Sequence, residues 1–153
     1  KKHNYKALIV RTNIIGFRRG TVDSFFEWLI KSIKNNTKIN LYINYYTSPI
    51  SVMLLGKILL KCYERNLSGT YNIASSMVID KYNFGLKVAN KFGFSNLNII
   101  ATEFIKTNTD LQRVLTLGLD VSKIESALNE KMPSIDDNLN TLYLEYIGFN
   151  ESK

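Results

Sequence analysis

Polar side chains follow a short apolar stretch near the start of the sequence. The stretch ALIV, residues 7–10, runs directly into Arg11, Thr12 and Asn13. A polar side chain just past a buried parallel strand lies at the carboxyl edge of the sheet, where open α/β sheets bind their ligands. Asn13 is therefore a candidate ligand-binding residue, although asparagine close to a glycine is also common in turns.

Arginine and aromatic side chains could together bind a nucleotide. Arg18, Arg19 and Arg113 carry guanidinium groups, whose planar donors match phosphate oxygens. Arginines are also common on surfaces that bind nothing, so the residue type alone leaves both interpretations open. Phe25 and Trp28 could stack on a nucleobase, but aromatic residues at helical spacing more often pack in a core.

The sequence contains no self-sufficient catalytic or metal-binding pattern. Its eight glycines never fall into the GxGxxG spacing of a dinucleotide-binding loop, and there is no P-loop. With His3 as its single histidine and Cys62 as its single cysteine, the sequence cannot assemble a Cys/His metal site within one chain. Because the single histidine lies near a chain end, we do not expect a Ser-His-Asp or Cys-His catalytic arrangement. We therefore predict no catalytic residue and no metal ligand.

The formal charge of +7, from 20 Lys and Arg against 13 Asp and Glu, favours an anionic partner. Nucleic acid, acidic lipid and phosphorylated small molecules all meet this criterion. The lysines are spread along the chain, however, and no run of five like charges marks a nucleic-acid-binding tail. No apolar run approaches the roughly 18 residues of a membrane span, so we expect a soluble, cytoplasmic protein. A basic module that binds RNA or DNA stays open as an alternative.

Hydrophobic periodicity predicts alternating strands and helices around these residues. Short apolar or alternating stretches predict strands, and apolar residues at three- and four-residue steps predict helices. The predicted strands cover residues 5–12, 38–44, 70–74 and 97–101, and the predicted helices cover residues 21–34 and 51–64, the segment between Asp80 and Gly93, and two segments that begin near Ser122 and Ser134. This order predicts an α/β fold with at least a partly parallel sheet, and we expect residues 1–153 to form a single unit.

Polar residues near the predicted helix ends indicate how the helices begin and stop. Asp80 is placed to cap a helix that Gly93 ends. Ser122 with Glu125, and Ser134 with Asp137, have the spacing of capping boxes. The helix over residues 51–64 is apolar almost all round, which predicts a place in the middle of the fold.

A series of local motifs resembles one protein family by its order along the chain. The series is Arg11-Thr12-Asn13-Ile14-Ile15-Gly16, Phe25 to Trp28, Ser48-Pro49, Gly69-Thr70-Tyr71-Asn72-Ile73, Leu119-Asp120 and Ser122-Lys123. It resembles the C-terminal half of an extended short-chain dehydrogenase/reductase, and within that superfamily the sugar-nucleotide reductases of the dTDP-4-dehydrorhamnose reductase type. The resemblance covers residues 5–146. The chain departs from the family at Asn44, where the family has an acid before Ser-Pro, and at Arg113-Val114, where it has Arg-Pro.

The resemblance implies part of a Rossmann-like NAD(P)-binding fold, with a small mixed sheet and packed helices, lacking the N-terminal glycine-loop half. Residues 1–20 resemble a late strand and rim of the Rossmann sheet. The family reduces with a Tyr-x-x-x-Lys pair, and none of the nine tyrosines here has a lysine four residues on. A tyrosine can protonate the developing alkoxide only if a nearby cation makes its phenol acidic enough. NAD(P) is therefore expected in the intact enzyme, with Thr12 facing it, but not on this chain alone.

The resemblance also implies a nucleoside-diphosphate sugar as substrate. The implied substrate-binding residues are Asn13, Arg18, Trp28, Tyr45, Ser48 and Arg113. Tyr45 and Ser48 would form a wall facing the sugar, although they could equally be an ordinary helix-entry loop before Pro49. The implied function is the substrate-binding part of a reductase of dTDP-rhamnose biosynthesis, with the missing half as its partner. An epimerase or dehydratase of the same superfamily, a non-catalytic relative used for assembly, and a homodimer stay open.

Overall fold

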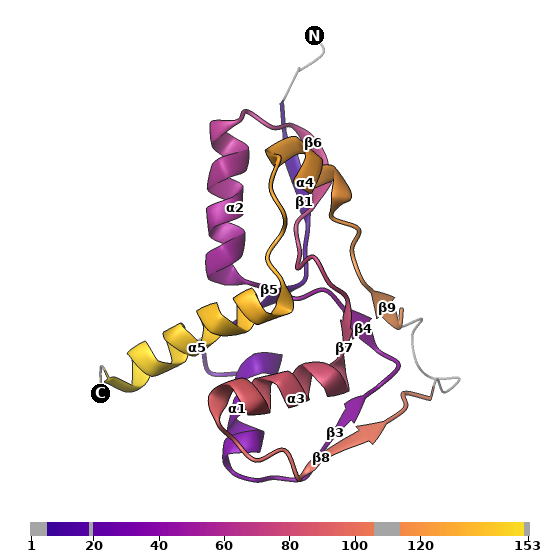
Figure 1. The fold of residues 1–153 in the computed structure, drawn as a ribbon, viewed down its shortest axis with the longest axis vertical. Coiled ribbons are helices and arrows are strands. Elements are labelled where there is room, and N and C mark those ends of the chain that lie inside the picture. The colour runs from indigo at the N-terminus through magenta and orange to yellow at the C-terminus, as the bar shows by residue number, and fades with distance from the viewer. Residues whose placement is uncertain (1–5, 19, 106–113, 152–153) are drawn as a thin grey trace.

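The secondary-structure elements form two groups that meet at a layer of short strands, as Figure 1 shows for the computed structural model. The structure describes residues 6–18, 20–105 and 114–151. The strands are β1 (Leu8–Arg11), β2 (Ile14–Ile15), β3 (Ile39–Tyr42), β4 (Tyr46–Thr47), β5 (Ile50–Ser51), β6 (Gly69–Asn72), β7 (Ile79–Asp80), β8 (Ile99–Thr102) and β9 (Thr116–Leu117). The helices are α1 (Phe25–Lys34), α2 (Val52–Glu64), α3 (Lys81–Phe92), α4 (Ser122–Leu128) and α5 (Ile135–Glu151). Helices combined with small parallel sheets confirm the predicted α/β class.

The first group packs α2 and α4 against the parallel strands β1 and β6. Leu8 lies opposite Gly69 in this pair. Leu8 and Val10 pack against a buried cluster built mainly from α2 and α4. Ile9 points to the other face of β1, where its side chain is 56% exposed. Within the described residues, the second face of β1 is therefore uncovered.

The second group packs α3 against the parallel strands β3 and β8, and α1 and α5 pack against α3. Ile39 and Leu41 are buried while Asn40 and Tyr42 are exposed, as the alternation of this stretch predicts. Gly85 of α3 lies so close to β3 that a side chain at this position would collide with Leu41. The glycine therefore lets the helix pack closely on the strand.

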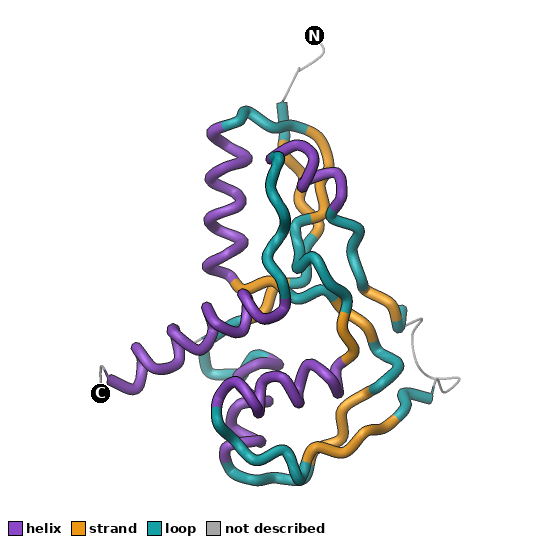
Figure 2. Tube along the Cα trace, viewed as in Figure 1, coloured by secondary structure: helices purple, strands orange, loops and turns teal. Residues whose placement is uncertain are grey.

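The junction between the two groups consists of two-residue strands and loops, seen as short orange segments between teal loops in Figure 2. β2 pairs in parallel with β5, and β4 pairs antiparallel with β7 and parallel with β9. Sequence analysis missed all five strands, because two residues are too few for a periodic pattern. β5 runs directly into α2 and β7 into α3, so these pairs fix where both helices begin.

Hydrogen bonds confirm the caps predicted for α3 and α5. Asp80 Oδ1 accepts a hydrogen bond from the Asn83 backbone N at 2.8 Å, and Gly93 ends α3 with a left-handed φ of 69°. Before α5, Ser134 Oγ accepts from the Asp137 backbone N at 3.1 Å, and Asp137 Oδ2 accepts from the Ser134 backbone N at 2.9 Å. The hydrogen bonds from Ser134 lower the pKa of the Asp137 carboxyl group.

The predicted start of α1 and the predicted capping box of α4 are wrong. α4 begins at Ser122, as predicted, but Ser122 is its first helical residue and no side chain caps the helix. The Ser122 backbone N donates to Asp120 Oδ1 at 2.9 Å. α1 begins at Phe25 rather than at residue 21, because Ser24 and Glu27 form a capping box there.

Helix α2 has one buried face, although its composition predicts burial all round. Leu55, Ile58 and Cys62 are buried, and this burial raises the pKa of the Cys62 thiol. On the other face, Met53 and Leu60 are 52% and 64% exposed. The predicted central position of α2 is therefore wrong for the part of the chain that the structure describes.

Candidate functional site

Asn13 ties the segment after β1 to two other segments of the chain. Its Nδ2 donates a hydrogen bond to the Leu117 carbonyl at 2.6 Å and a longer one to Ser48 Oγ at 3.4 Å. The Leu119 backbone N donates to the same Ser48 hydroxyl at 3.0 Å. Asn13 and Ser48, both predicted as site residues, are thus brought together. Ser48 is fully buried, so its hydroxyl organises this edge, and its contact with a sugar stays a prediction.

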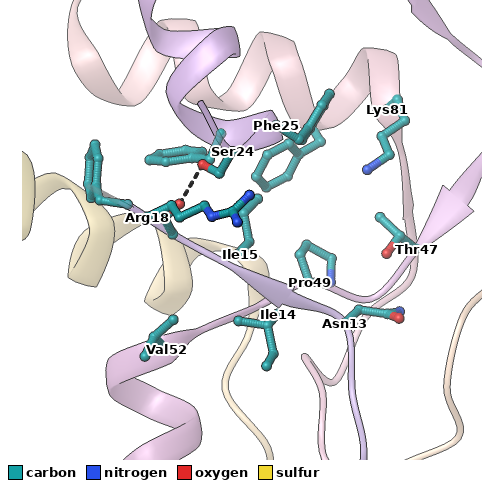
Figure 3. Close-up of a pocket in the computed structure, with 14 residues that line it drawn as sticks. Asn13, Ile14, Ile15, Arg18, Ser24, Phe25, Thr47, Pro49, Val52 and Lys81 are labelled. Atoms are coloured by element: carbon teal, nitrogen blue, oxygen red, sulfur yellow. Dashed lines mark hydrogen bonds between the residues drawn. The ribbon is translucent and has the colours of Figure 1, made fainter. Parts of the chain in front are cut away.

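A cavity of about 430 Å³ opens beside Asn13 (Figure 3). Its lining residues are Asn13, Ile14, Ile15, Gly16, Phe17, Arg18, Ser24, Phe25, Phe26, Thr47, Pro49, Val52, Lys81 and Phe84. Ser24, the N-cap of α1, donates from Oγ to the Gly16 carbonyl at 2.7 Å and so holds α1 against the segment after β2. Figure 3 shows Arg18 and Lys81 entering the cavity from opposite sides. We call this space the arginine cavity.

A second cavity of about 450 Å³ lies next to the first and is mainly aromatic. Its lining residues are Phe25, Trp28, Asn40, Leu41, Tyr42, Tyr45, Thr47, Lys81, Phe104 and Leu117. The predicted residues Trp28 and Tyr45 therefore share one site, which we call the aromatic cavity. Trp28 is 40% exposed and lies 5.8 Å from the Phe25 ring, between centroids. Phe25, Thr47 and Lys81 line both cavities, which makes the two spaces neighbours.

Lys81 is the site residue that sequence analysis missed. It is the first residue of α3, directly after the cap Asp80. A basic residue in the first turn opposes the helix dipole, which favours acids there. This mismatch is the sequence signal that could have identified Lys81.

Two further predictions, for Thr12 and Arg113, stay untested. The Thr12 hydroxyl is buried and has no hydrogen-bond partner among the described residues, so its role toward a cofactor stays a prediction. The prediction for Arg113 lies outside the described residues.

Asn44 holds the loop after β3 through its amide group. Its Nδ2 donates to the Phe104 carbonyl at 3.1 Å, and its Oδ1 accepts from the Phe104 backbone N at 2.9 Å. These two bonds place Phe104 at the wall of the aromatic cavity. The asparagine that departs from the resembled family is therefore a structural link beside the site.

The described segments hold no cluster of three or more His, Cys, Asp or Glu side chains that could bind a metal ion. Nor does any helix in those segments have the length and apolar character needed to cross a membrane. Among the described residues that line the two cavities there is no Asp or Glu, whereas Lys81 lines both cavities and Arg18 lines one. This distribution of charge suits an anionic ligand.

Replacing Asn13 by aspartate tests the hydrogen bond that holds this edge. A carboxylate cannot donate to the Leu117 carbonyl, so we expect Asn13→Asp to lower the free energy of unfolding by about 0.5–1.5 kcal/mol. Urea denaturation followed by circular dichroism measures this loss. The control is Asn40→Asp, the same chemical change at an exposed residue of β3. Equal stability of the two variants would show that the Asn13 amide has no structural role.

Comparison with known sequences identifies a partial relative. No family model matches the sequence. The probable low-salt glycan biosynthesis reductase Agl14 of Haloferax volcanii is 25% identical over 150 residues, which cover 96% of this chain and 50% of that protein. The chain thus spans half the length of this curated relative.

Solved structures of sugar-nucleotide enzymes share the fold. dTDP-4-dehydrorhamnose reductase from Bacillus anthracis, in complex with NADP, aligns with a TM-score of 0.76 and 20% identity over 90% of this chain and 48% of that one. UDP-glucose 4-epimerase from Thermotoga maritima, with UDP-glucose, aligns with a TM-score of 0.68 and 15% identity over 94% of this chain and 46% of that one. The predicted resemblance is confirmed at the level of fold: the chain has the fold of about half of an extended short-chain dehydrogenase/reductase.

Proposed function

We propose that this chain is the C-terminal, substrate-binding part of an NAD(P)-dependent sugar-nucleotide reductase, and that it binds a nucleoside-diphosphate sugar. The observation that carries the proposal is the pair of neighbouring cavities, whose described lining residues combine cationic and aromatic side chains and include no acid. Guanidinium and ammonium groups bind phosphate, and aromatic rings accept a base or a sugar face. The fold shared with enzymes that act on such substrates supports the same conclusion.

The uncovered faces of the first group support a missing half. Parallel sheets are normally buried on both faces, yet Ile9 on β1 and Met53 and Leu60 on α2 are exposed. In the intact enzyme, an N-terminal half would cover β1 and supply the glycine loop, the tyrosine and the lysine. NAD(P) would supply the hydride there. The segment around Thr12 would then face the cofactor, and the complete protein would act in the cytoplasm.

The choice of a reductase rests on the relatives. The Haloferax volcanii protein is described as a probable reductase, and the Bacillus anthracis structure is a dTDP-4-dehydrorhamnose reductase. An epimerase is the second candidate, because the Thermotoga maritima epimerase has the same fold over 94% of this chain. The formal charge of +7 favours a nucleic-acid-binding role, whereas the two cavities favour a small anionic ligand.

Isothermal titration calorimetry with dTDP, UDP and a polynucleotide tests the proposal. We expect the nucleoside diphosphates to bind, and the polynucleotide to bind weakly with an affinity that falls steeply with salt. Binding of the polynucleotide alone would contradict the proposal and favour a nucleic-acid-binding module.

Two charge-removing variants show whether the ligand binds in the arginine cavity. Arg18→Gln should weaken the binding of dTDP or UDP, because it removes a guanidinium group that lines this cavity. Lys57→Gln removes an equal charge from an exposed position on α2, away from both cavities, and should leave the affinity unchanged. An equal effect of the two variants would indicate that net charge, rather than this site, binds the nucleotide.

A further inference from the structure

Lys81 occupies the boundary between the arginine cavity and the aromatic cavity. Its backbone N donates to the Tyr45 carbonyl at 3.1 Å, and the preceding Asp80 pairs with Tyr46 in the β4–β7 ladder. These backbone contacts fix the start of α3 at the junction of the two groups. The Lys81 side chain is half-buried and lines both cavities.

The surroundings of the Lys81 ammonium group are unfavourable for a cation in several ways. Desolvation lowers the pKa of Lys81 below the ordinary lysine value. The group lies at the N-terminal end of a helix, where the dipole is positive. Within the described residues, Lys81 forms neither an ion pair nor a side-chain hydrogen bond. A contribution to the stability of the fold therefore does not explain why residue 81 is a lysine.

Aromatic rings provide part of the missing stabilisation. Lys81 Nζ lies 4.0 Å from the centre of the Phe25 ring and 5.8 Å from that of Tyr45. Both distances fall within the range of cation–π attraction. The rings approach the ammonium group without neutralising it, so its positive charge stays available to a ligand. Arg18 adds a second positive charge on the opposite side of the arginine cavity.

We propose that Lys81 binds the diphosphate of the ligand at the boundary between the two cavities, so that the base extends into the aromatic cavity and the diphosphate faces Arg18 across the arginine cavity. This assignment rests on the proposed function, because it takes the ligand to be a nucleoside-diphosphate sugar. An oxygen of the diphosphate supplies the hydrogen-bond acceptor and the negative charge that Lys81 lacks in the described chain. The aromatic cavity, with Trp28 and Tyr45, accepts the base by stacking.

Calorimetric titration of the full 153-residue chain tests the assignment with dTDP, inorganic pyrophosphate and thymidine. Lys81→Met should raise the Kd of dTDP and of pyrophosphate about ten- to one-hundredfold, because a charge-assisted hydrogen bond is lost. Thymidine carries no phosphate, so its affinity should not change. Lys81→Arg should retain most of the dTDP affinity.

Lys91→Met is the matched control for the loss of a cation–π contact. Lys91 lies on the same helix, with Nζ 5.3 Å from the centre of the Tyr143 ring, and it lines neither cavity. We expect this variant to bind dTDP like the wild type. Thermal melting should show Lys81→Met to be at least as stable as the wild type, because the desolvated charge is gone. A purely structural lysine would instead lose stability when replaced.

The outcomes separate this assignment from the proposed function. Unchanged dTDP affinity in Lys81→Met would overturn the role of Lys81 while leaving the nucleotide site in place. If the wild type binds pyrophosphate but not dTDP, and Lys81→Met abolishes that binding, the anion site stands and the nucleotide-sugar function fails. If the wild type binds neither compound, both proposals are overturned.

Discussion

Purified alone, the 153-residue chain is expected to oxidise no NADPH or NADH in the presence of a 4-keto sugar nucleotide. Reduction of a ketone needs a hydride from the nicotinamide and a proton at the developing alkoxide. The sequence has neither a glycine-rich cofactor loop nor a tyrosine with a lysine four residues on. The loss of absorbance at 340 nm should therefore equal that of a sample without protein.

The Bacillus anthracis reductase, assayed with the same substrate, is the positive control for this measurement, because it shares the fold over 90% of this chain. A rate above background from the chain alone would contradict the prediction and would point to a catalytic group unlike the Tyr-x-x-x-Lys pair. Activity that develops only after the chain is joined to a cofactor-binding half would support the proposal that this chain binds the substrate and the other half binds the cofactor. Variant Ile9→Asp places a charge on the uncovered face of β1 and should prevent that recovery without unfolding the chain.

Replacing Phe26 by alanine is expected to give the largest loss of stability among the aromatic residues of α1. Phe26 is completely buried, and its ring centroid lies 5.2 Å from that of Phe17 and 5.9 Å from that of Phe92. Truncating a buried phenylalanine typically costs about 3–5 kcal/mol. Because domains are stable by only about 5–15 kcal/mol, this loss would bring the chain close to unfolding. Urea denaturation monitored by circular dichroism measures the difference.

Trp28→Ala is the matched variant on the same helix. Trp28 is 40% exposed at the aromatic cavity, so its truncation should cost less than about 1 kcal/mol. It should instead weaken the binding of thymidine and dTDP, because a stacking surface is lost. Comparable destabilisation by both substitutions would mean that Trp28 belongs to the core and not to the site.

Sequence patterns predicted the longer elements because each is long enough to show a period. The alternation around Ile39 and Leu41, the helix from Asp80 to Gly93 and the capping box at Ser134 all correspond to observed elements. The two-residue strands at the junction could not be predicted, since backbone pairing between distant segments decides them. The start of α1 could have been predicted, because Ser24 and Glu27 have capping-box spacing.

The candidate site was predicted in part for a similar reason. Asn13 follows a recognisable strand, Trp28 belongs to a motif of the resembled family, and Tyr45 lies shortly before the Ser48-Pro49 motif, so their types and order were informative. Lys81 belongs to none of these motifs. Its position at the boundary of two cavities depends on how α3, α1 and the β4–β7 pair pack in three dimensions. The only sequence signal of this arrangement is a basic residue in the first turn of a helix, and this signal is weak.

The open side of β1 also has a consequence for solubility. Within the described residues β1 pairs only with β6, so its other edge presents backbone groups that can pair with a strand from another molecule. Charged Lys6 and Arg11 flank the apolar core of this strand and oppose such pairing. Because this edge is open, we nevertheless expect the soluble yield to fall as protein concentration rises, and co-expression with a segment that pairs with β1 to restore it. Aggregation during expression would then indicate that β1 lacks a pairing partner, and not that the chain fails to fold.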